Sequence, residues 1–313
     1  YTLQPQASLT VIDQSTGEVK AIVGGRGDKT ASKTLNRATD TTRQPGSTFK
    51  ILASYSAALD AGGLTLASVQ DDAPYTYAGA NGKSVSNYDK RYRGFTTLRE
   101  AITDSINIVT VKTLAQVGVS LGWQYVQEYG FTTVDSRDMN EALALGGITQ
   151  GVSNLELTAA YAAIANQGTY IKPKFYTKIL DHDGNVLIDN TTPESHTVIK
   201  DTTAWLLTSA MEDVMTSGTG TSAYFGSSMA QAGKSGTTTS SRDALFAGYT
   251  PYYTCAVWGG YDDNAMQKGS DTNYPKRIWK AVMKRIHENL AYKDFTKPSG
   301  IVAVAVCKES GKL

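Results

Sequence analysis

The chain has 313 residues, of which 41% are hydrophobic and 19% charged, a composition that can bury a sizeable core and differs from that of disordered chains. Thirty basic residues against 29 acidic ones leave a net charge of +1, so there is no broad basic field of the kind used to bind nucleic acid. No apolar run reaches the length of a membrane span, no signal peptide is visible, and the first residue is Tyr1 rather than methionine. We therefore expect a soluble fragment without its anchor or targeting segment.

Alternating apolar residues predict two hairpins and three further strands. The first hairpin joins residues 7–13 to residues 18–23 through a polar turn, at the edge of a sheet. The second joins residues 175–180 to residues 185–188 through Asp183 and Gly184. The three later strands are predicted at residues 229–234, 244–249 and 254–260.

Between the hairpins the apolar residues repeat at helical spacing. One helix is predicted to follow the break at Pro45 and Gly46 and to end before Gly62. Capping-box patterns begin at Thr97 and Ser153, and the second leads into a helix that ends before Gly168. Two more amphipathic helices are expected at residues 202–216 and 275–290.

Strands near both chain ends with helices in the middle predict an α+β fold. We expect one domain over residues 1–313, with its sheet built from residues 1–30 and about 175–313. The helical part is expected at about residues 47–170. Two glycines among small polar residues at 217–222 predict a mobile loop.

The cysteines and histidines offer little chemistry. Cys255 and Cys307 are too few for a disulfide framework and lack metal-ligand spacing, and both lie in apolar, strand-like stretches where two buried thiols are as plausible as a disulfide. The three histidines, His182, His196 and His287, lie in polar stretches and are expected to be exposed. A Ser-His-Asp triad is therefore not indicated.

The most informative pair is Ser47 and Lys50, a spacing of serine and lysine that occurs once in the chain. Residues i and i+3 share one helix face, so a hydroxyl and a potential base can meet without tertiary contacts. Backbone N–H groups at a helix N-terminus would help to stabilise a nearby oxyanion. The alternative is that Ser47 only caps its helix.

Two further triplets follow in order, Ser105-Ile-Asn107 and Lys234-Ser-Gly236. The first interrupts a helical stretch and could be an ordinary helix junction, and the second follows a predicted strand and could be a solvated strand end. A phosphate-binding loop is the rival interpretation of Lys234-Ser-Gly236, but its motif requires glycine at position 228, where Ser228 stands.

Together three motifs resemble those of penicillin-binding proteins and serine β-lactamases: Ser47-Thr-Phe-Lys50, then Ser105-Ile-Asn107 as the second triplet and Lys234-Ser-Gly236 as the third. The sequence around these motifs is similar to the transpeptidase domain of class A penicillin-binding proteins, from about residue 7 to about residue 290. The stretches that show the similarity are residues 36–39, 43–46, 144–147, 243–251 and 257–262. Two residues depart from the commoner pattern: Ser235 replaces threonine, and Ile51 stands where many relatives have proline.

The resemblance implies an antiparallel five-stranded sheet flanked by helices, with an all-helical subdomain and with no cofactor or metal. In that family a membrane anchor and a glycosyltransferase domain precede the transpeptidase. The parent protein would therefore act at the extracytoplasmic face of the bacterial cell membrane. Peptidoglycan stem peptides, as donor and as amine acceptor, and β-lactam antibiotics would be its partners, and nucleic acid would not.

The resemblance also implies the roles of the site residues. Ser47 would be the nucleophile that attacks a D-Ala-D-Ala peptide, Lys50 the general base, and Ser105 a proton relay toward the leaving amine. Lys234 would attract the terminal carboxylate. The substrate-binding residues would be Asn107, Ser235, Gly236, Thr237 and Thr239.

Finer roles follow from the same resemblance. Backbone N–H groups of Ser47 and Thr237 would form the oxyanion hole. Apart from the resemblance, we expect Arg242 and Asp243 to border the acceptor side of the cleft. Three other functions stay open at this point: a D,D-carboxypeptidase, a β-lactamase, and a penicillin-sensing module that acylates once and signals.

Overall fold

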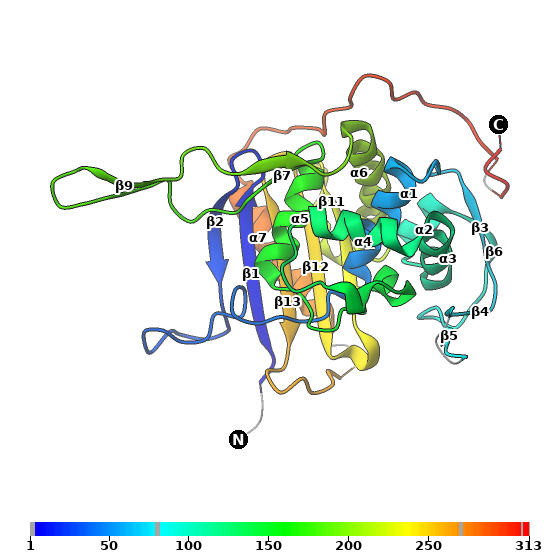
Figure 1. The fold of residues 1–313 in the computed structure, drawn as a ribbon, viewed down its shortest axis with the longest axis horizontal. Helices are drawn as coiled ribbons and strands as arrows, with labels where there is room; N and C mark the ends of the chain where they lie inside the picture. Colours follow the sequence, from blue (N-terminus) through cyan, green and yellow to red (C-terminus); the bar gives the residue numbers. More distant parts are fainter. Residues whose placement is uncertain (1–3, 79–81, 269–271, 308, 313) are drawn as a thin grey trace.

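The structure is a computed structural model that describes residues 4–78, 82–268, 272–307 and 309–312. Its centre is a five-stranded sheet in the order β11-β12-β13-β1-β2, and every neighbouring pair is antiparallel (Figure 1). The strands are β1 (Gln6–Asp13), β2 (Glu18–Val23), β11 (Ala232–Thr237), β12 (Asp243–Tyr249) and β13 (Thr254–Gly260). The predicted α+β class and five-stranded antiparallel sheet are confirmed, with β2 and β11 as the edge strands.

Seven α-helices are described, and most of them lie between β2 and β11 in the sequence. They are α1 (Ser56–Asp60), α2 (Leu98–Thr103), α3 (Asn107–Val117), α4 (Val119–Glu128), α5 (Asn154–Ala165), α6 (Asp201–Thr216) and α7 (Tyr274–Ile286). Short helical turns are η1 (Gly46–Thr48), η3 (Ser136–Asp138), η4 (Glu141–Leu145), η5 (Thr221–Ala223) and η6 (Thr239–Ser241), and η2 (Lys50–Tyr55) is a π-helix.

Four small two-stranded sheets complete the fold. They pair β3 (Val69–Asp72) with β6 (Gly94–Thr97), β4 (Tyr75–Thr76) with β5 (Ser84–Val85), β7 (Thr169–Ile171) with β10 (Ser195–Thr197), and β8 (Lys178–Leu180) with β9 (Val186–Asp189). The predicted second hairpin is therefore present as β8 and β9. It projects from the body as a separate arm, so the central sheet uses only residues 6–23 and 232–260, a narrower range than predicted (Figure 1). Residues 1–3 of the predicted range lie outside the described residues.

The sheet is the middle of three layers because its strands alternate apolar side chains between two faces. On one face Val257 and Phe246 pack against Trp279 of α7. On the other face Ala256 and Leu245 join the larger core with the helices of the middle segment. The turn that contains Ser47 packs on this larger core through Phe49 and contacts the edge strand β11.

Most predicted helices occur where expected. Ser153 forms a complete capping box with Glu156 and starts α5 at Asn154, and α6 matches its predicted range within one residue. Helix α7 ends at Ile286, short of residue 290. The helix predicted after Pro45 is instead three successive turns of different kinds, η1, η2 and α1.

Two predictions about single residues are wrong. His287 is buried, because its ring packs near Phe225 and bonds the Thr250 hydroxyl at 2.8 Å. Cys307 is exposed, since residues 301–307 form no strand, whereas Cys255 is buried as expected. Both cysteines are free thiols.

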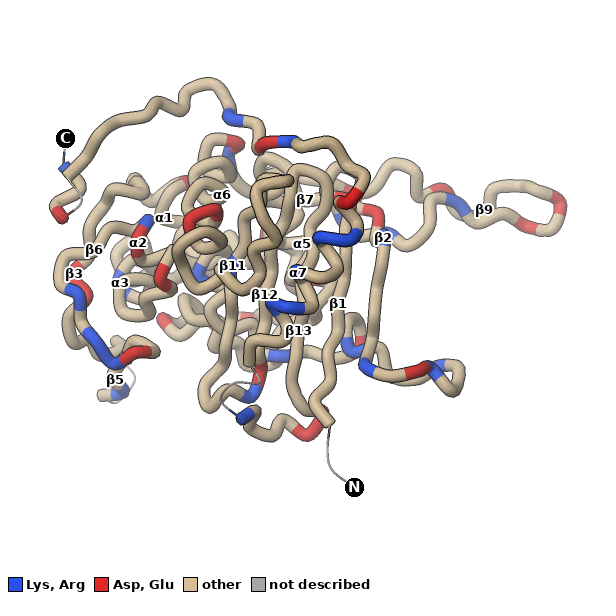
Figure 2. Tube along the Cα trace, turned by 180° about the vertical axis from the view of Figure 1, so that it is seen from behind, with Lys and Arg blue, Asp and Glu red and all other residues tan. Residues whose placement is uncertain are grey.

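Charge is spread over the molecule without a large region of one sign. Figure 2 shows basic and acidic residues interspersed along the chain, including on the β8–β9 arm. Among the described residues, no helix combines the length and apolar character needed to cross a membrane.

Candidate active site

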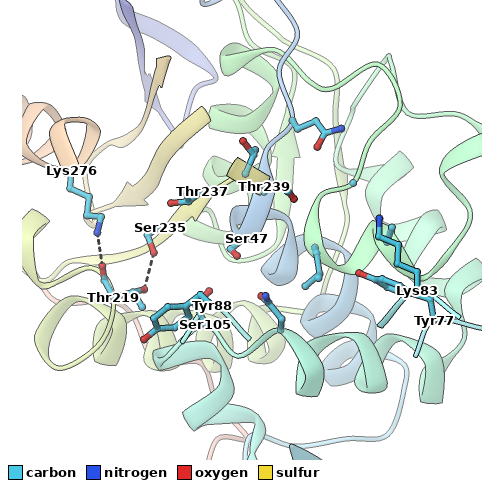
Figure 3. Close-up of a pocket in the computed structure, with 17 residues that line it drawn as sticks. Ser47, Tyr77, Lys83, Tyr88, Ser105, Thr219, Ser235, Thr237, Thr239 and Lys276 are labelled. Atoms are coloured by element: carbon cyan, nitrogen blue, oxygen red, sulfur yellow. Dashed lines mark hydrogen bonds between the residues drawn. The ribbon is translucent and has the colours of Figure 1, made fainter. Parts of the chain in front are cut away.

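A cavity of about 560 Å³ opens where the edge strand β11 meets the helical part. It brings together residues from all three motifs, since Ser47, Ser105, Asn107 and Ser235 line it, as do Thr237 and Thr239 beyond the last motif. In Figure 3, Ser47 lies between β11, which carries Ser235 and Thr237, and the helical segment that carries Ser105. Segments distant in sequence thus converge on one hydroxyl.

Close backbone contact holds the Ser47 turn against β11. Gly46 has a φ of +54°, and a Cβ built on it would lie 3.0 Å from the carbonyl oxygen of Thr237. A Cβ on Gly236 would lie 2.7 Å from the carbonyl oxygen of Pro45. Glycine at both positions therefore lets the two backbones approach, and Gly236 serves this packing whatever else it does.

Lys50 is fully buried beneath the cavity, and its ammonium contacts the second triplet. Its Nζ donates to the Ser105 carbonyl at 2.6 Å, to Ser105 Oγ at 3.2 Å and to Asn107 Oδ1 at 2.6 Å. These contacts match the three donors of an ammonium group. Burial, and secondarily repulsion from Lys234, holds the pKa of Lys50 well below its ordinary value of 10.5.

Ser105 and Asn107 lie where one helix stops and another begins. Helix α2 ends at Thr103 and α3 begins at Asn107, as the interrupted helical pattern predicted. Between them Ser105 has a φ of 58°, a conformation that non-glycine residues adopt at an energetic cost. That backbone turns both the carbonyl and the hydroxyl of Ser105 toward Lys50.

Lys234 and Ser235 lie inside β11 rather than after a strand, which corrects the predicted position of the third triplet. Lys234 is fully buried, and its burial, followed by repulsion from Lys276, lowers its pKa to about 7. Ser235 Oγ donates to the Thr219 hydroxyl at 2.8 Å. Because β11 is an edge strand of the sheet, Thr237 is exposed at the mouth of the cavity.

A buried asparagine that the sequence did not single out supports the second triplet. Asn87 Oδ1 accepts from the backbone N–H groups of Asn107 at 3.0 Å and of Ile108 at 3.2 Å, so it caps α3 from another segment. Its Nδ2 donates to the two carboxylate oxygens of Asp72 at 2.7 and 3.0 Å. Next to it, the carbonyl of Ser86 accepts from Asn107 Nδ2 at 2.7 Å. The amide of Asn107 is thereby fixed with its oxygen toward Lys50.

The segment around Asn87 also supplies one wall of the cavity. Tyr77 and Lys83 line it on the side away from Ser235 and Thr219, and Tyr88 lines it beside Ser105 (Figure 3). No signal in the sequence marked these residues, because their segment reaches the site through tertiary contacts, such as the bonds of Ser86 and Asn87 to Asn107.

A smaller cavity of about 340 Å³ adjoins the first and shares Gln44, Thr238 and Thr239 with it. Arg242 and Asp243 line this second cavity. The carboxylate of Asp243 is engaged within the protein: it accepts from Arg43 Nε at 2.7 Å and from the Trp258 indole at 2.9 Å.

None of the histidines lines the main cavity, and the described residues contain no group of three or more histidine, cysteine or acidic side chains that could hold a metal. The polar groups that surround Ser47 are lysine, serine, threonine and asparagine side chains. Such an arrangement can activate a hydroxyl, bind a carboxylate and orient an amide.

Comparison with known proteins identifies relatives over almost the whole chain. Residues 7–287 match the family described as penicillin binding protein transpeptidase domain. Penicillin-binding protein 1A of Clostridium botulinum (strain Langeland) is 37% identical over 99% of this chain and 38% of its own length. Penicillin-binding protein 1F of Bacillus subtilis (strain 168) is 38% identical over 95% of this chain and 41% of its own length. The chain thus spans about two fifths of these relatives.

The fold is likewise shared with solved structures. The crystal structure of penicillin-binding protein 1A from Haemophilus influenzae superimposes with a TM-score of 0.85 and 26% identity, covering 98% of this chain and 51% of that one. The PonA1 protein from Mycobacterium tuberculosis has the same fold, with a TM-score of 0.82 at 24% identity. With its motifs gathered in one cavity and this likeness in sequence and fold, the chain belongs to the penicillin-binding protein transpeptidase domain family.

Proposed function

We propose that this domain is a D,D-transpeptidase that crosslinks peptidoglycan stem peptides through a serine acyl-enzyme and is inhibited covalently by β-lactams. The observation that carries the proposal is the fully buried ammonium of Lys50, held on Ser105 and Asn107 beneath a cavity that Ser47 lines. A lysine whose pKa is held well below its ordinary value spends more time in the neutral form that can accept a proton.

In the first half-reaction Ser47 Oγ attacks the carbonyl carbon of the penultimate D-Ala, and Lys50 takes the hydroxyl proton. The backbone N–H groups of Ser47 and Thr237 stabilise the oxyanion, a contribution of roughly 3–4 kcal/mol per donor. The proton then passes through the Ser105 hydroxyl to the leaving amine. The peptide bond breaks, the terminal D-Ala departs, and an ester on Ser47 remains.

In the second half-reaction an acceptor amine attacks the ester carbonyl, gives up a proton through the same groups and restores the Ser47 hydroxyl. Asn107 holds the acyl amide of the donor. Lys234, Ser235, Thr237 and Thr239 bind the donor carboxylate in the first half-reaction, and Gly236 keeps the strand close to Ser47. The names of the curated relatives, penicillin-binding proteins, agree with a β-lactam entering as an analogue of the donor.

The test is intact-mass and peptide mapping after incubation with benzylpenicillin, beside an assay of D-Ala release with an amine acceptor. We expect one long-lived adduct on Ser47, none in Ser47→Ala, and D-Ala release coupled to new amide formation. An adduct on Ser47→Ala would refute the proposal. Rapid loss of the adduct would indicate a β-lactamase, hydrolysis without transfer a carboxypeptidase, and acylation without any peptide turnover a sensing module.

A further inference from the structure

Lys276 reaches the cavity from the opposite side of the sheet. It lies in the first turn of α7, whose Trp279 and Met283 pack on the face of the sheet away from the helical part. Its side chain nevertheless lines the main cavity, beside Thr219 and Ser235 (Figure 3). No motif of the sequence includes this lysine, and the proposed chemistry leaves it without a role.

The contacts of Lys276 connect it to the third triplet. Its Nζ donates to the carbonyl of Thr219 at 3.0 Å, and the hydroxyl of Thr219 accepts from Ser235 Oγ at 2.8 Å. An ammonium group has three N–H donors. One is engaged by Thr219, and no carboxylate within the described residues forms an ion pair with Lys276, so donors remain for a ligand in the cavity.

The electrostatics of this corner favour an anion. Repulsion from Lys276 contributes to the lowered pKa of Lys234, so the two ammonium groups lie close enough to oppose each other's charge. Burial also lowers the pKa of Lys276. Among the described residues neither lysine has an acidic partner, so a negatively charged ligand in the cavity next to Lys276 would offset the repulsion between the two ammonium groups.

We propose that Lys276 is a second carboxylate-binding residue, which together with Lys234 and the Ser235 hydroxyl holds the terminal carboxylate of the donor peptide and the carboxylate of a β-lactam. This inference rests on the proposed function, since it assigns a further contact in the same donor site. Its ligand class is a small carboxylate next to the reacting carbonyl, with Thr219 positioning Lys276 and Ser235 side by side.

The test compares benzylpenicillin with its methyl ester, which lacks the negative charge. The second-order rate constant of Ser47 acylation is measured by intact mass for the wild type, Lys276→Met, Lys276→Arg and the control Lys280→Met. Lys280 lies one turn further along α7 and does not line the cavity. We expect Lys276→Met to reduce the acid-to-ester rate ratio about tenfold, the effect of about 1.4 kcal/mol. Lys276→Arg should keep most of the ratio and Lys280→Met all of it.

The outcomes separate the inference from its premise. An unchanged ratio in Lys276→Met overturns the inference, as does an equal loss for both probes, which would mean that Lys276 only holds the Thr219 loop in place. If Lys276→Met does not fold, Lys276→Gln takes its place: a loss of the acid-to-ester ratio of about tenfold supports the inference, and an unchanged ratio overturns it. Failure of the wild type to form any Ser47 adduct would instead refute the proposed function.

Discussion

The most demanding prediction concerns Asn87, because its effect should appear both in stability and in acylation. Replacing Asn87 with alanine removes the acceptor of two N–H groups at the start of α3 and the donor to Asp72, which is fully buried. A neutral hydrogen bond contributes about 1 kcal/mol and one to a charged group about 1.5–3 kcal/mol, with more lost when buried partners stay unsatisfied. The change should lower the free energy of unfolding by roughly 3–6 kcal/mol.

The same change should slow acylation, because the carbonyl of Ser86 and the side chain of Asn87 together orient Asn107 toward Lys50. We expect at least a tenfold lower rate constant with benzylpenicillin at a temperature where the variant stays folded. The matched control is Asn185→Ala, which removes an exposed asparagine-aspartate contact, Asn185 Nδ2 to Asp181 Oδ2 at 3.0 Å, in the turn of the β8–β9 arm. It should cost less than about 0.5 kcal/mol and leave acylation unchanged.

A double-mutant cycle makes the reasoning refutable. Asn87→Asp keeps the acceptor for α3 but sets two carboxylates against each other, and Asp72→Asn alone weakens the charged hydrogen bond. In the swapped pair, Asp72→Asn with Asn87→Asp, an amide again faces a carboxylate, so part of the lost stability and acylation should return. Additive losses in denaturant unfolding, or Asn87→Ala behaving like Asn185→Ala, would show that Asn87 does not position the site.

Three further predictions concern protons and backbone contact. The pKa of Lys234 is about 7 in the folded protein and 10.5 ordinarily. Between these pH values the lysine holds its proton in the unfolded chain but not in the folded one. The free energy of unfolding should therefore rise with pH, by up to about 1.4 kcal/mol per pH unit from this residue. In thermal unfolding, Lys234→Met should show a smaller rise of stability with pH than the wild type. Its stability relative to the wild type should therefore be higher at pH 7 than at pH 9. Parallel curves of stability against pH for the two proteins would contradict this prediction. Acylation by benzylpenicillin methyl ester, which has no carboxylate for Lys234 to bind, should rise with pH and level off below pH 10.5 as Lys50 loses its proton. A profile still rising at pH 10.5 would exclude a lowered pKa of Lys50 as the cause. Gly236→Ala should slow acylation more than tenfold, because its Cβ would meet the Pro45 carbonyl at 2.7 Å, whereas Gly184→Ala, whose Cβ would meet no atom within 4 Å, should leave the rate constant unaltered.

The sequence anticipated those parts of the molecule whose signals are local. The capping box at Ser153, the β1–β2 hairpin and the amphipathic α6 each depend on residues close together in the chain, and each occurs as predicted. The order of three short polar motifs pointed to one site, and Ser47, Ser105 and Ser235 do share one cavity.

What the sequence missed depends on tertiary contacts. Asn87 lies in a segment of exposed and polar residues, and only the fold places its amide under α3. Lys276 reads as one basic residue among several on α7, and its position at the edge of β11 decides its surroundings. His287 was expected at the surface because its sequence neighbours are polar, yet its ring lies between Thr250 and the backbone of Met283.

The register of the central sheet constrains how this domain can be made. Strand β1 pairs with β2 on one side and with β13 on the other, where Ile12 pairs with Thr254, so the β1–β2 hairpin cannot join the rest of the sheet until residue 254 is available. Closing so long a loop costs on the order of 5 kcal/mol in chain entropy, and contacts of this separation slow folding. The helices between β2 and β11 can pack together earlier, but the main cavity is complete only when β11 lies beside Ser47. We therefore expect the active site to form late in the folding of the domain.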